Sequence, residues 1–232
     1  MIAHRGASAV APESTRAAIR EAARAGADMV ELDVQVTRDG RLIIFHDDRL
    51  ERTTDGSGRV ADARYSQLAR LDAGSWFHQR FAGERILLVS QAIQVVPRRM
   101  GINLELKRTP HRRALLRRLR RVVRRGRVVR RLLISSFDPH LLQPLHATGL
   151  PLALICRRAP DASLQRAIQL RCVAWHPFHA LATRRRIAQA HDAGLRVHAW
   201  TVNSRARARQ LARWGVDGVF TNHPARLGGL RP

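Results

Sequence analysis

The segment ADMVELDVQVTRDGRLIIFHDD, residues 27–48 of this 232-residue chain, combines two strand-like runs with several candidate site residues. Glu31 and Asp33 alternate with Leu32 and Val34, and alternate residues of an extended strand share a face. Two buried carboxylates on one face repel each other, so the pair predicts a cation between them. Mg²⁺ and Ca²⁺ prefer such oxygen ligands. The stretch therefore predicts a strand that carries a divalent-metal site.

A turn follows the acid pair. Asp39-Gly40 is a strong signal for a tight turn between two strand-like runs. The second run, residues 42–45, leads directly to His46. A two-residue turn would place Asp33 opposite His46 on the neighbouring strand. We expect an antiparallel hairpin that carries both a metal-type carboxylate and a histidine.

Strand-like and helix-like segments alternate along the rest of the chain. Eight such units predict an α/β fold, a closed (β/α)₈ TIM barrel. The hairpin accounts for a ninth strand candidate, because a tight turn cannot connect parallel neighbours. A helix is expected to begin within residues 12–15, where Pro, Glu, Ser and Thr are typical of a helix start. The other expected strands are residues 1–6, 102–107, 132–137, 152–156, 172–176, 196–202 and 218–222, and the later helices cover 89–96, 113–124, 139–147, 161–169, 183–192 and 204–213.

Residues 49–85 interrupt this alternation. They carry turn signals, one short helical run at residues 65–71 and several aromatic side chains. A loop of this length in a compact domain is usually functional or disordered, and the aromatic residues favour a small cap. We expect one domain over residues 1–232, because α/β barrels of this length often form a single unit, with the cap inserted after the third strand.

The formal net charge is +24, and Lys107 is the only lysine among 42 basic residues. A compositional bias toward arginine is the simplest explanation. A nucleic-acid or anionic-membrane partner, including one for the basic helix face within residues 111–131, is the alternative. Lysine and arginine differ in shape and hydration, so a lysine kept against the bias indicates a site that requires it.

Other features narrow the class of protein. No apolar run approaches the roughly 20 residues of a membrane span, and the first residues do not resemble a signal peptide. Cys156 and Cys172 have no metal-ligand spacing, and two thiols do not make a disulfide framework. We therefore expect a cytoplasmic protein.

Chemically active side chains lie at the ends of the predicted strands. A barrel gathers such groups at the carboxyl ends of its strands. Together they suit phosphodiester hydrolysis, in which carboxylates hold a divalent ion, fixed cations stabilise developing charge and histidines act as acid and base. The residues are His4, Arg5, Glu31, Asp33, His46, Glu105, Lys107 and Trp200.

Motifs spread over nearly the whole chain point to a known family. In order they are HRG, PES-T, ELDVQVTRDG, HDDRLERTTDGSG, LDAGSWF, LELK, SSF, WTVN and GVDGVFTNHP. Together they resemble the glycerophosphodiester phosphodiesterase family, and FAGERILLVSQAI resembles its cytoplasmic bacterial branch. The resemblance implies a (β/α)₈ barrel of the phospholipase-C-like group that hydrolyses glycerophosphodiesters to sn-glycerol 3-phosphate and an alcohol.

The resemblance also implies a divalent metal, Mg²⁺ or Ca²⁺ with Mn²⁺ as an option, and a small-molecule glycerophosphodiester substrate rather than nucleic acid. It leaves the oligomeric state and the head group open. It assigns acid/base catalysis to His4 and His46, substrate binding to Arg5, Lys107 and Trp200, and metal binding to Glu31, Asp33 and Glu105.

The chain departs from the family pattern at two places. Ser14 stands where the family usually has Asn, and we expect it to cap the following helix as Asn would. Residues 87–91 read LLVSQ where many members have Pro-Thr-Leu-Glu-Glu, a change outside the expected metal ligands.

Two alternative functions remain at this point. One is a phospholipase-D-like or lyase activity on lysophospholipids, which would use the same histidines and metal. The other is a noncatalytic barrel that binds anions or nucleic acid through its arginines. The paired acids and histidines favour the enzyme, because an anion binder has no need of them.

Overall fold

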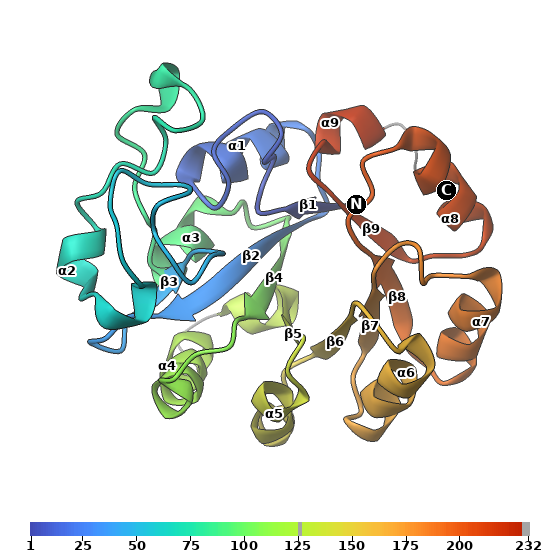
Figure 1. Ribbon diagram of the computed structural model, residues 1–232. Helices are drawn as coiled ribbons and strands as arrows, with labels where there is room; N and C mark the ends of the chain where they lie inside the picture. The colour runs from blue at the N-terminus through green and yellow to red at the C-terminus, as the bar shows by residue number, and fades with distance from the viewer. Residues whose placement is uncertain (125–126, 229–232) are drawn as a thin grey trace.

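The computed structural model describes residues 1–124 and 127–228. It contains an α/β barrel with helices outside a ring of strands (Figure 1). The strands are β1 Ile2–His4, β2 Met29–Val36, β3 Leu42–Ile44, β4 Gly101–Leu106, β5 Leu132–Ser136, β6 Leu152–Cys156, β7 Ala174–Pro177, β8 Arg196–Ala199 and β9 Gly218–Thr221.

Eight parallel strands close the barrel in the order β1, β2, β4, β5, β6, β7, β8 and β9. Closure occurs at β1, which pairs with β2 through Ala3 and Val30 and with β9 through Ala3 and Thr221. The predicted (β/α)₈ fold is confirmed. The short strand β1 is therefore paired on both sides, and this pairing positions His4 at its end.

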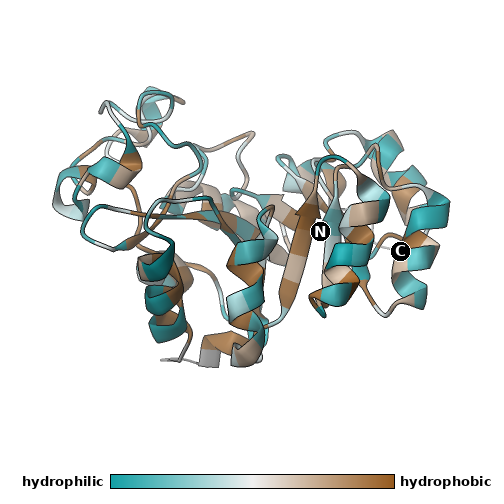
Figure 2. Cartoon of the chain, turned by 60° about the horizontal axis from the view of Figure 1, so that its bottom comes forward, coloured by the Kyte–Doolittle hydropathy of each residue, from teal (hydrophilic) through white to brown (hydrophobic). Residues whose placement is uncertain are grey.

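Helices surround the ring and turn their polar faces outward (Figure 2). Apolar residues of the strands that point outward, such as Leu32 and Val34, pack beneath them in the main hydrophobic core. The helices are α1 Arg16–Arg24, α2 Tyr65–Leu68, α3 Val89–Val95, α4 Arg112–Arg124, α5 Pro139–Leu142, α6 Pro160–Gln169, α7 Arg184–Asp192, α8 Arg205–Arg213 and α9 Pro224–Leu227, with short 3₁₀ turns at Val60–Asp62, Gln79–Phe81, Arg127–Arg131 and Gln143–Thr148.

The predicted hairpin is present, but its turn differs from the expected one. β3 pairs with β2 antiparallel, and Val36 faces Leu42. The Gly40 N–H donates to the Thr37 carbonyl at 2.8 Å, and Gly40 has a φ of 72°. The loop therefore has three residues and ends in a left-handed glycine, not two residues. The extra loop residue shifts the register of the two strands, so Asp33 faces Phe45 rather than His46. The Phe45 N–H donates to the Asp33 carbonyl at 2.9 Å.

The insertion between β3 and α3 folds against the hairpin. Its buried side chains form a small cluster on Ile43 and Phe45 of the β3 segment. Leu50, Val60 and Leu68 belong to this cluster. The predicted cap region thus shares a small apolar cluster with the hairpin, and it lies over the β2–β3 side of the barrel (Figure 1).

The start of α1 corrects the expectation for Ser14. The N-cap is Thr15, whose side-chain oxygen accepts from the Ala18 N–H at 3.3 Å. Ser14 precedes the cap and has a φ of 63°, in the left-handed region. Asn tolerates that region better than most residues, so an Asn at this position serves backbone conformation rather than capping.

Most of the basic face of α4 lies within the described residues and is exposed to solvent. The helix buries Leu115 and Leu119 and exposes Arg113, Arg117 and Arg120. The side chains of Arg124 and Arg127 and residues 125–126, which belong to the predicted basic stretch 111–131, lie outside the described part of the chain. Within residues 1–124 and 127–228, no helix combines the length and hydrophobicity needed to cross a membrane.

Candidate active site

Three carboxylates meet at the carboxyl end of neighbouring strands. Glu31 and Asp33 lie on β2, and β4 places Glu105 beside Asp33 in register. One oxygen atom of each lies within 4.8 Å of the others. Glu31 and Asp33 are 2% and 1% exposed. The alternation seen in the sequence therefore does direct both acids to one face, toward the barrel interior.

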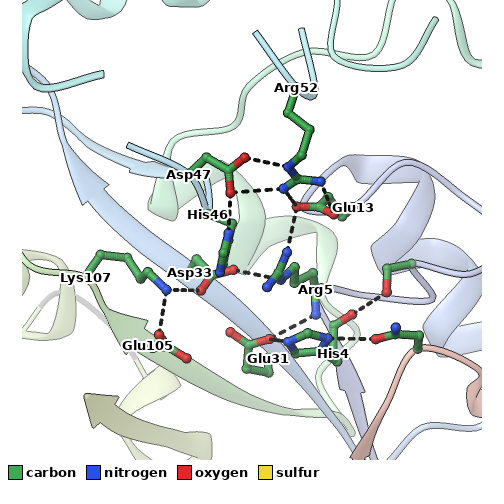
Figure 3. A network of polar contacts seen from close by, with 12 residues as sticks. His4, Arg5, Glu13, Glu31, Asp33, His46, Asp47, Arg52, Glu105 and Lys107 are labelled. Atoms are coloured by element: carbon green, nitrogen blue, oxygen red, sulfur yellow. Dashed lines mark hydrogen bonds and ion pairs between the residues drawn. The ribbon is translucent and has the colours of Figure 1, made fainter. Parts of the chain in front are cut away.

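Two cations neutralise part of this charge. The Lys107 Nζ lies 2.8 Å from Glu105 Oε1 and 3.3 Å from Asp33 Oδ1. The Arg5 Nε lies 3.4 Å from Asp33 Oδ2, and the Arg5 backbone N–H donates to Glu31 Oε2 at 3.0 Å (Figure 3). The lone lysine therefore lies within this acidic cluster.

The carboxylates have divergent acidities. Burial raises the pKa of Glu31 well above its ordinary value, and the neighbouring Asp33 and Glu105 add to the rise. Burial, together with the Asp33 charge, raises the pKa of Glu105 to about 7. Burial also acts upward on Asp33, but Lys107 and Arg5 outweigh it and the pKa of Asp33 lies below its ordinary value. Lys107 and Arg5 thus favour the charged form of Asp33. The pKa values of Glu31 and Glu105 stay raised, because the nearby positive charge does not offset their burial and their repulsion by other carboxylates.

The donor set fits a divalent metal ion. Glu31 Oε1 and Asp33 Oδ2 are buried and accept no hydrogen bond from the described part of the chain, although Asp33 Oδ2 has an ion pair with Arg5 Nε at 3.4 Å. Buried carboxylate oxygens that lack a hydrogen bond are costly unless a further ligand satisfies them. A hard cation with oxygen preference would satisfy both and offset the excess negative charge.

In both His4 and His46, the Nδ1 atom lies within hydrogen-bond distance of a side-chain oxygen. His4 Nδ1 lies 2.7 Å from Asn222 Oδ1, and His46 Nδ1 lies 2.5 Å from Asp47 Oδ1. These oxygens favour the tautomer with hydrogen on Nδ1, which leaves the Nε2 lone pair free. His4 Nε2 points toward Glu31 and lies 4.0 Å from its Oε2 (Figure 3). Both rings can therefore exchange a proton through Nε2.

Burial lowers the pKa of both histidines. The pKa of His4 falls from 6.5 to about 4, and the Arg5 charge adds to the effect of burial. Burial also lowers the pKa of His46, although Asp33 and the hydrogen bond to Asp47 act in the opposite direction. Both shifts favour the neutral imidazole, the form that can accept a proton.

Trp200 lies apart from the charged cluster. It follows β8, which stands across the ring from β4. Its indole N–H donates to the His176 carbonyl at 2.8 Å, and its ring packs edge-on against Phe137 and Phe178 with centroids 5.4 and 5.5 Å away. The mouth of the barrel thus has a charged side on β1, β2 and β4 and an aromatic side near β8.

The sequence did not single out the residues that support the charged cluster. Asn222 holds His4, and Glu13 accepts from Arg5 at 3.0 Å. Arg52, from the insertion, binds both Glu13 and Asp47. Only Asn222 could have been suspected, because it follows β9, and a closed barrel places β9 beside β1.

Comparisons with known proteins agree with this geometry. Residues 4–226 match the model of the glycerophosphoryl diester phosphodiesterase family. A glycerophosphodiester phosphodiesterase of Caldanaerobacter subterraneus is 31% identical over 234 residues, 98% of this chain and 95% of that one. The enzyme of the same name from Bacillus altitudinis is 31% identical over 239 residues, 100% of this chain and 97% of that one.

Solved structures agree as well. An Oleispira antarctica phosphodiesterase in complex with the product sn-glycerol-3-phosphate matches with a TM-score of 0.92 and 33% identity, covering 98% of this chain and 94% of that one. A glycerophosphodiester phosphodiesterase from Agrobacterium tumefaciens matches with a TM-score of 0.86 and 29% identity, with 98% of each chain covered. The chain therefore belongs to the glycerophosphodiester phosphodiesterase family of enzymes.

Proposed function

We propose that this enzyme hydrolyses glycerophosphodiesters to sn-glycerol 3-phosphate and an alcohol, with a divalent metal ion and two-histidine acid/base catalysis. The observation that carries the proposal is the joint placement of two Nδ1-anchored histidines around three carboxylates, of which Glu31 and Asp33 are buried and Glu105 is partly buried. The product named for the Oleispira antarctica relative supports the proposed product.

Glu31, Asp33 and Glu105 would hold the metal ion. When bound, the ion supplies Lewis acidity that offsets negative charge on the phosphoryl oxygens. Arg5 and Lys107, already fixed by the carboxylates, add positive charge toward the same phosphoryl group. Mg²⁺, Ca²⁺ and Mn²⁺ all accept a ligand set made only of carboxylates.

The histidines would divide the proton transfers. One Nε2 takes the proton of the attacking water, and the other, protonated, gives its proton to the oxygen of the departing alcohol. The Nδ1 contacts keep both rings oriented with Nε2 toward the phosphodiester. Trp200, with its indole N–H already occupied, would offer only its ring face to the substrate.

The proposal extends to the setting of the enzyme. We propose that residues 1–232 form one domain with the insertion of about residues 49–85 as its cap, and that the protein acts in the cytoplasm on a small-molecule glycerophosphodiester. The insertion shares its apolar cluster with Ile43 and Phe45, which supports a single folding unit.

The test is turnover of glycerophosphocholine and glycerophosphoethanolamine, with Mg²⁺, Ca²⁺ or Mn²⁺ and after chelation. His46→Ala should lower kcat by about 10²- to 10⁴-fold, the range typical of a lost general acid or base. The control is His146→Ala, which removes an exposed histidine outside the site. Chelation should abolish turnover, and added metal should restore it.

Three outcomes would contradict parts of this proposal. Undiminished turnover by His46→Ala would remove the acid/base assignment. Full activity after chelation would remove the metal from the reaction. A cyclic phosphate product would indicate lyase chemistry in place of hydrolysis.

A further inference from the structure

Arg52 links Asp47, which contacts His46, to Glu13, which contacts Arg5. Among the described residues, its side chain has no hydrogen bond or ion pair with the three proposed metal ligands. It belongs to the insertion, whereas its partners precede α1 and follow β3. Arg52 Nε and Nη2 donate to Asp47 at 2.5 and 3.2 Å. Arg52 Nη2 and Nη1 donate to Glu13 at 2.6 and 3.1 Å. The planar guanidinium thus binds one carboxylate along each of two edges (Figure 3).

Each carboxylate held by Arg52 holds a group of the proposed reaction. Asp47 accepts from His46 Nδ1 at 2.5 Å. Glu13 accepts from Arg5 Nη1 at 3.0 Å, and Arg5 in turn faces Asp33. The chain of contacts therefore runs from the His46 ring through Arg52 to the Arg5 guanidinium. No other residue among those described makes contacts to both Glu13 and Asp47.

A fixed main chain does not by itself set the side-chain rotamers of His46 and Asp47. The hydrogen bonds through Arg52 are therefore needed to orient them. Gln35, buried on β2, donates to the carbonyls of His46 and Asp47 and fixes the main chain there. The Asp47 side chain is still 26% exposed. Its carboxylate could turn to solvent if Arg52 did not hold both oxygens.

We propose that Arg52 is a positioning residue that orients His46 through Asp47 and Arg5 through Glu13. The inference rests on the proposed two-histidine reaction and adds to it a residue from the cap. Folding of the insertion onto the barrel would then complete the alignment of the acid/base group with a phosphate-binding cation. Among the described residues, the Arg52 side chain hydrogen-bonds only to Glu13 and Asp47, neither of which is a proposed metal ligand or acid/base group.

A purely structural role makes a different prediction. The Arg52 side chain is 45% exposed, and exposed ion pairs contribute little to stability. If Arg52 only anchored the cap, its replacement would change the free energy of unfolding slightly and leave kcat unchanged. A positioning residue affects turnover much more than stability, because small misplacements of reacting groups cost up to about 10²-fold in rate.

The experiment compares Arg52→Ala, Arg52→Lys and Arg49→Ala in the full chain, with glycerophosphocholine and saturating metal. Arg49 is the matched control, since it lies in the same insertion and its side chain is 63% exposed and, among the described residues, pairs only with Glu51. Arg52→Ala should lower kcat about 10- to 100-fold with a smaller change in KM. Arg52→Lys should remain at least about 10-fold impaired, because an ammonium cannot bind two carboxylates along two edges. Arg49→Ala should match the wild type.

Two further readouts separate positioning from structure. Guanidinium ion added to Arg52→Ala should restore part of kcat by filling the vacated site. Nitrogen NMR of the histidine rings should show that His46 loses its single Nδ1–H tautomer in Arg52→Ala, while the resonances of His4 change less. Asp47→Asn and Arg52→Ala should be non-additive in kcat, because both act through His46.

The outcomes distinguish this inference from the proposed function. If His46→Ala is inactive but Arg52→Ala stays within about twofold of the wild type, the positioning role is wrong and the proposed reaction stands. If His46→Ala keeps full activity, the proposed reaction itself is wrong. Should Arg52→Ala fail to fold, Arg52→Lys decides the question, and wild-type kcat in that variant overturns the inference.

Discussion

Gly6 shows how one residue ties the candidate site to the helix that follows it. It comes directly after His4 and Arg5 and has a φ of 83°. A Cβ at this position would lie 2.7 Å from the carbonyl carbon and from the Cβ of Ala18 in α1. The glycine is thus required both by its backbone conformation and by the close approach of the helix.

We predict that Gly6→Ala destabilises the enzyme and lowers its kcat. The left-handed conformation costs an L-residue about 1–2 kcal/mol, and the overlap with Ala18 adds a further cost of about 1–3 kcal/mol. Any movement of the loop also moves Arg5, whose N–H contacts Glu31. Urea unfolding and steady-state kinetics measure the two effects.

The matched control is Gly26→Ala. Gly26 also has a positive φ, 71°, but a Cβ there would meet no atom within 4 Å. Its cost should therefore be limited to the conformational part of about 1–2 kcal/mol, with kcat unchanged. Equal destabilisation by the two variants would show that the contact with Ala18 is unimportant.

At the scale of the element, the first turn of α1 depends on Thr15 and not on Ser14. The Thr15 hydroxyl donates to the Pro12 carbonyl at 2.6 Å and accepts from the Ala18 N–H at 3.3 Å. The Ser14 hydroxyl is buried and has no hydrogen-bond partner in the described structure. Adjacent hydroxyl residues in the sequence therefore have unequal roles.

We predict that Thr15→Ala lowers the free energy of unfolding by about 1 kcal/mol, the usual cost of a lost N-cap. Ser14→Ala should change it by less than about 0.5 kcal/mol, since its hydroxyl makes no hydrogen bond to lose. Chemical denaturation of both variants measures the difference. A larger loss in Ser14→Ala than in Thr15→Ala would return the cap to Ser14.

At the scale of the whole molecule, two histidines lie inside the barrel beyond the candidate site. His176 on β7 and His198 on β8 are 0% and 7% exposed, and their rings are hydrogen-bonded at 3.1 Å. Burial lowers the pKa of His198 from 6.5 to about 4, with Arg196 adding to the shift. Burial, and then the His198 charge, lower the pKa of His176 well below 6.5. The native barrel therefore holds both rings in the neutral state.

The lowered pKa values of His176 and His198 in the native barrel determine how these residues change its stability with pH. The unfolded chain takes up a proton at these positions as the pH falls below 6.5, and the native barrel does so only near pH 4 for His198. Their contribution to stability is thus complete above pH 6.5 and is lost as the pH falls toward 4. For His198 the loss at pH 5 is on the order of 2 kcal/mol.

We predict that His198→Asn is less sensitive to acid than the wild type. An Asn amide preserves a hydrogen-bonding group near Nδ1 but does not titrate. Between pH 7 and pH 5 the wild type should lose on the order of 2 kcal/mol more unfolding free energy than the variant. Comparing each protein with itself across pH removes the opposing contributions of Glu31 and Glu105, which both proteins share. Identical pH dependence would contradict the assignment.

The same unfolding curves test the single-domain proposal. Circular dichroism reports the whole chain, and fluorescence reports tryptophans in both the insertion and the barrel, Trp76 and Trp175 among them. One domain should give coincident transitions. Separate transitions would indicate that the insertion unfolds independently.

The barrel and much of the charged cluster could be predicted from the sequence, because both follow from local geometry. Strand alternation places Glu31 and Asp33 on one face whatever lies elsewhere in the chain. Repeated strand–helix units leave few arrangements other than a parallel barrel, and the carboxyl ends of its strands then meet at one face. Glu105 and Lys107 could be added to the cluster for the same reason.

The hydrogen-bond partners of these residues could not be predicted, because they come from distant parts of the folded chain. His4 meets Asn222, 218 positions away, because barrel closure brings β9 beside β1. Arg52 reaches Glu13, 39 positions away, because the insertion packs back against the β2–β3 side of the barrel. Such contacts depend on how an irregular loop folds and on which side chains neutralise one another in a partly buried site. No periodicity in the sequence records either of these, since long-range packing and charge pairing are properties of the assembled barrel.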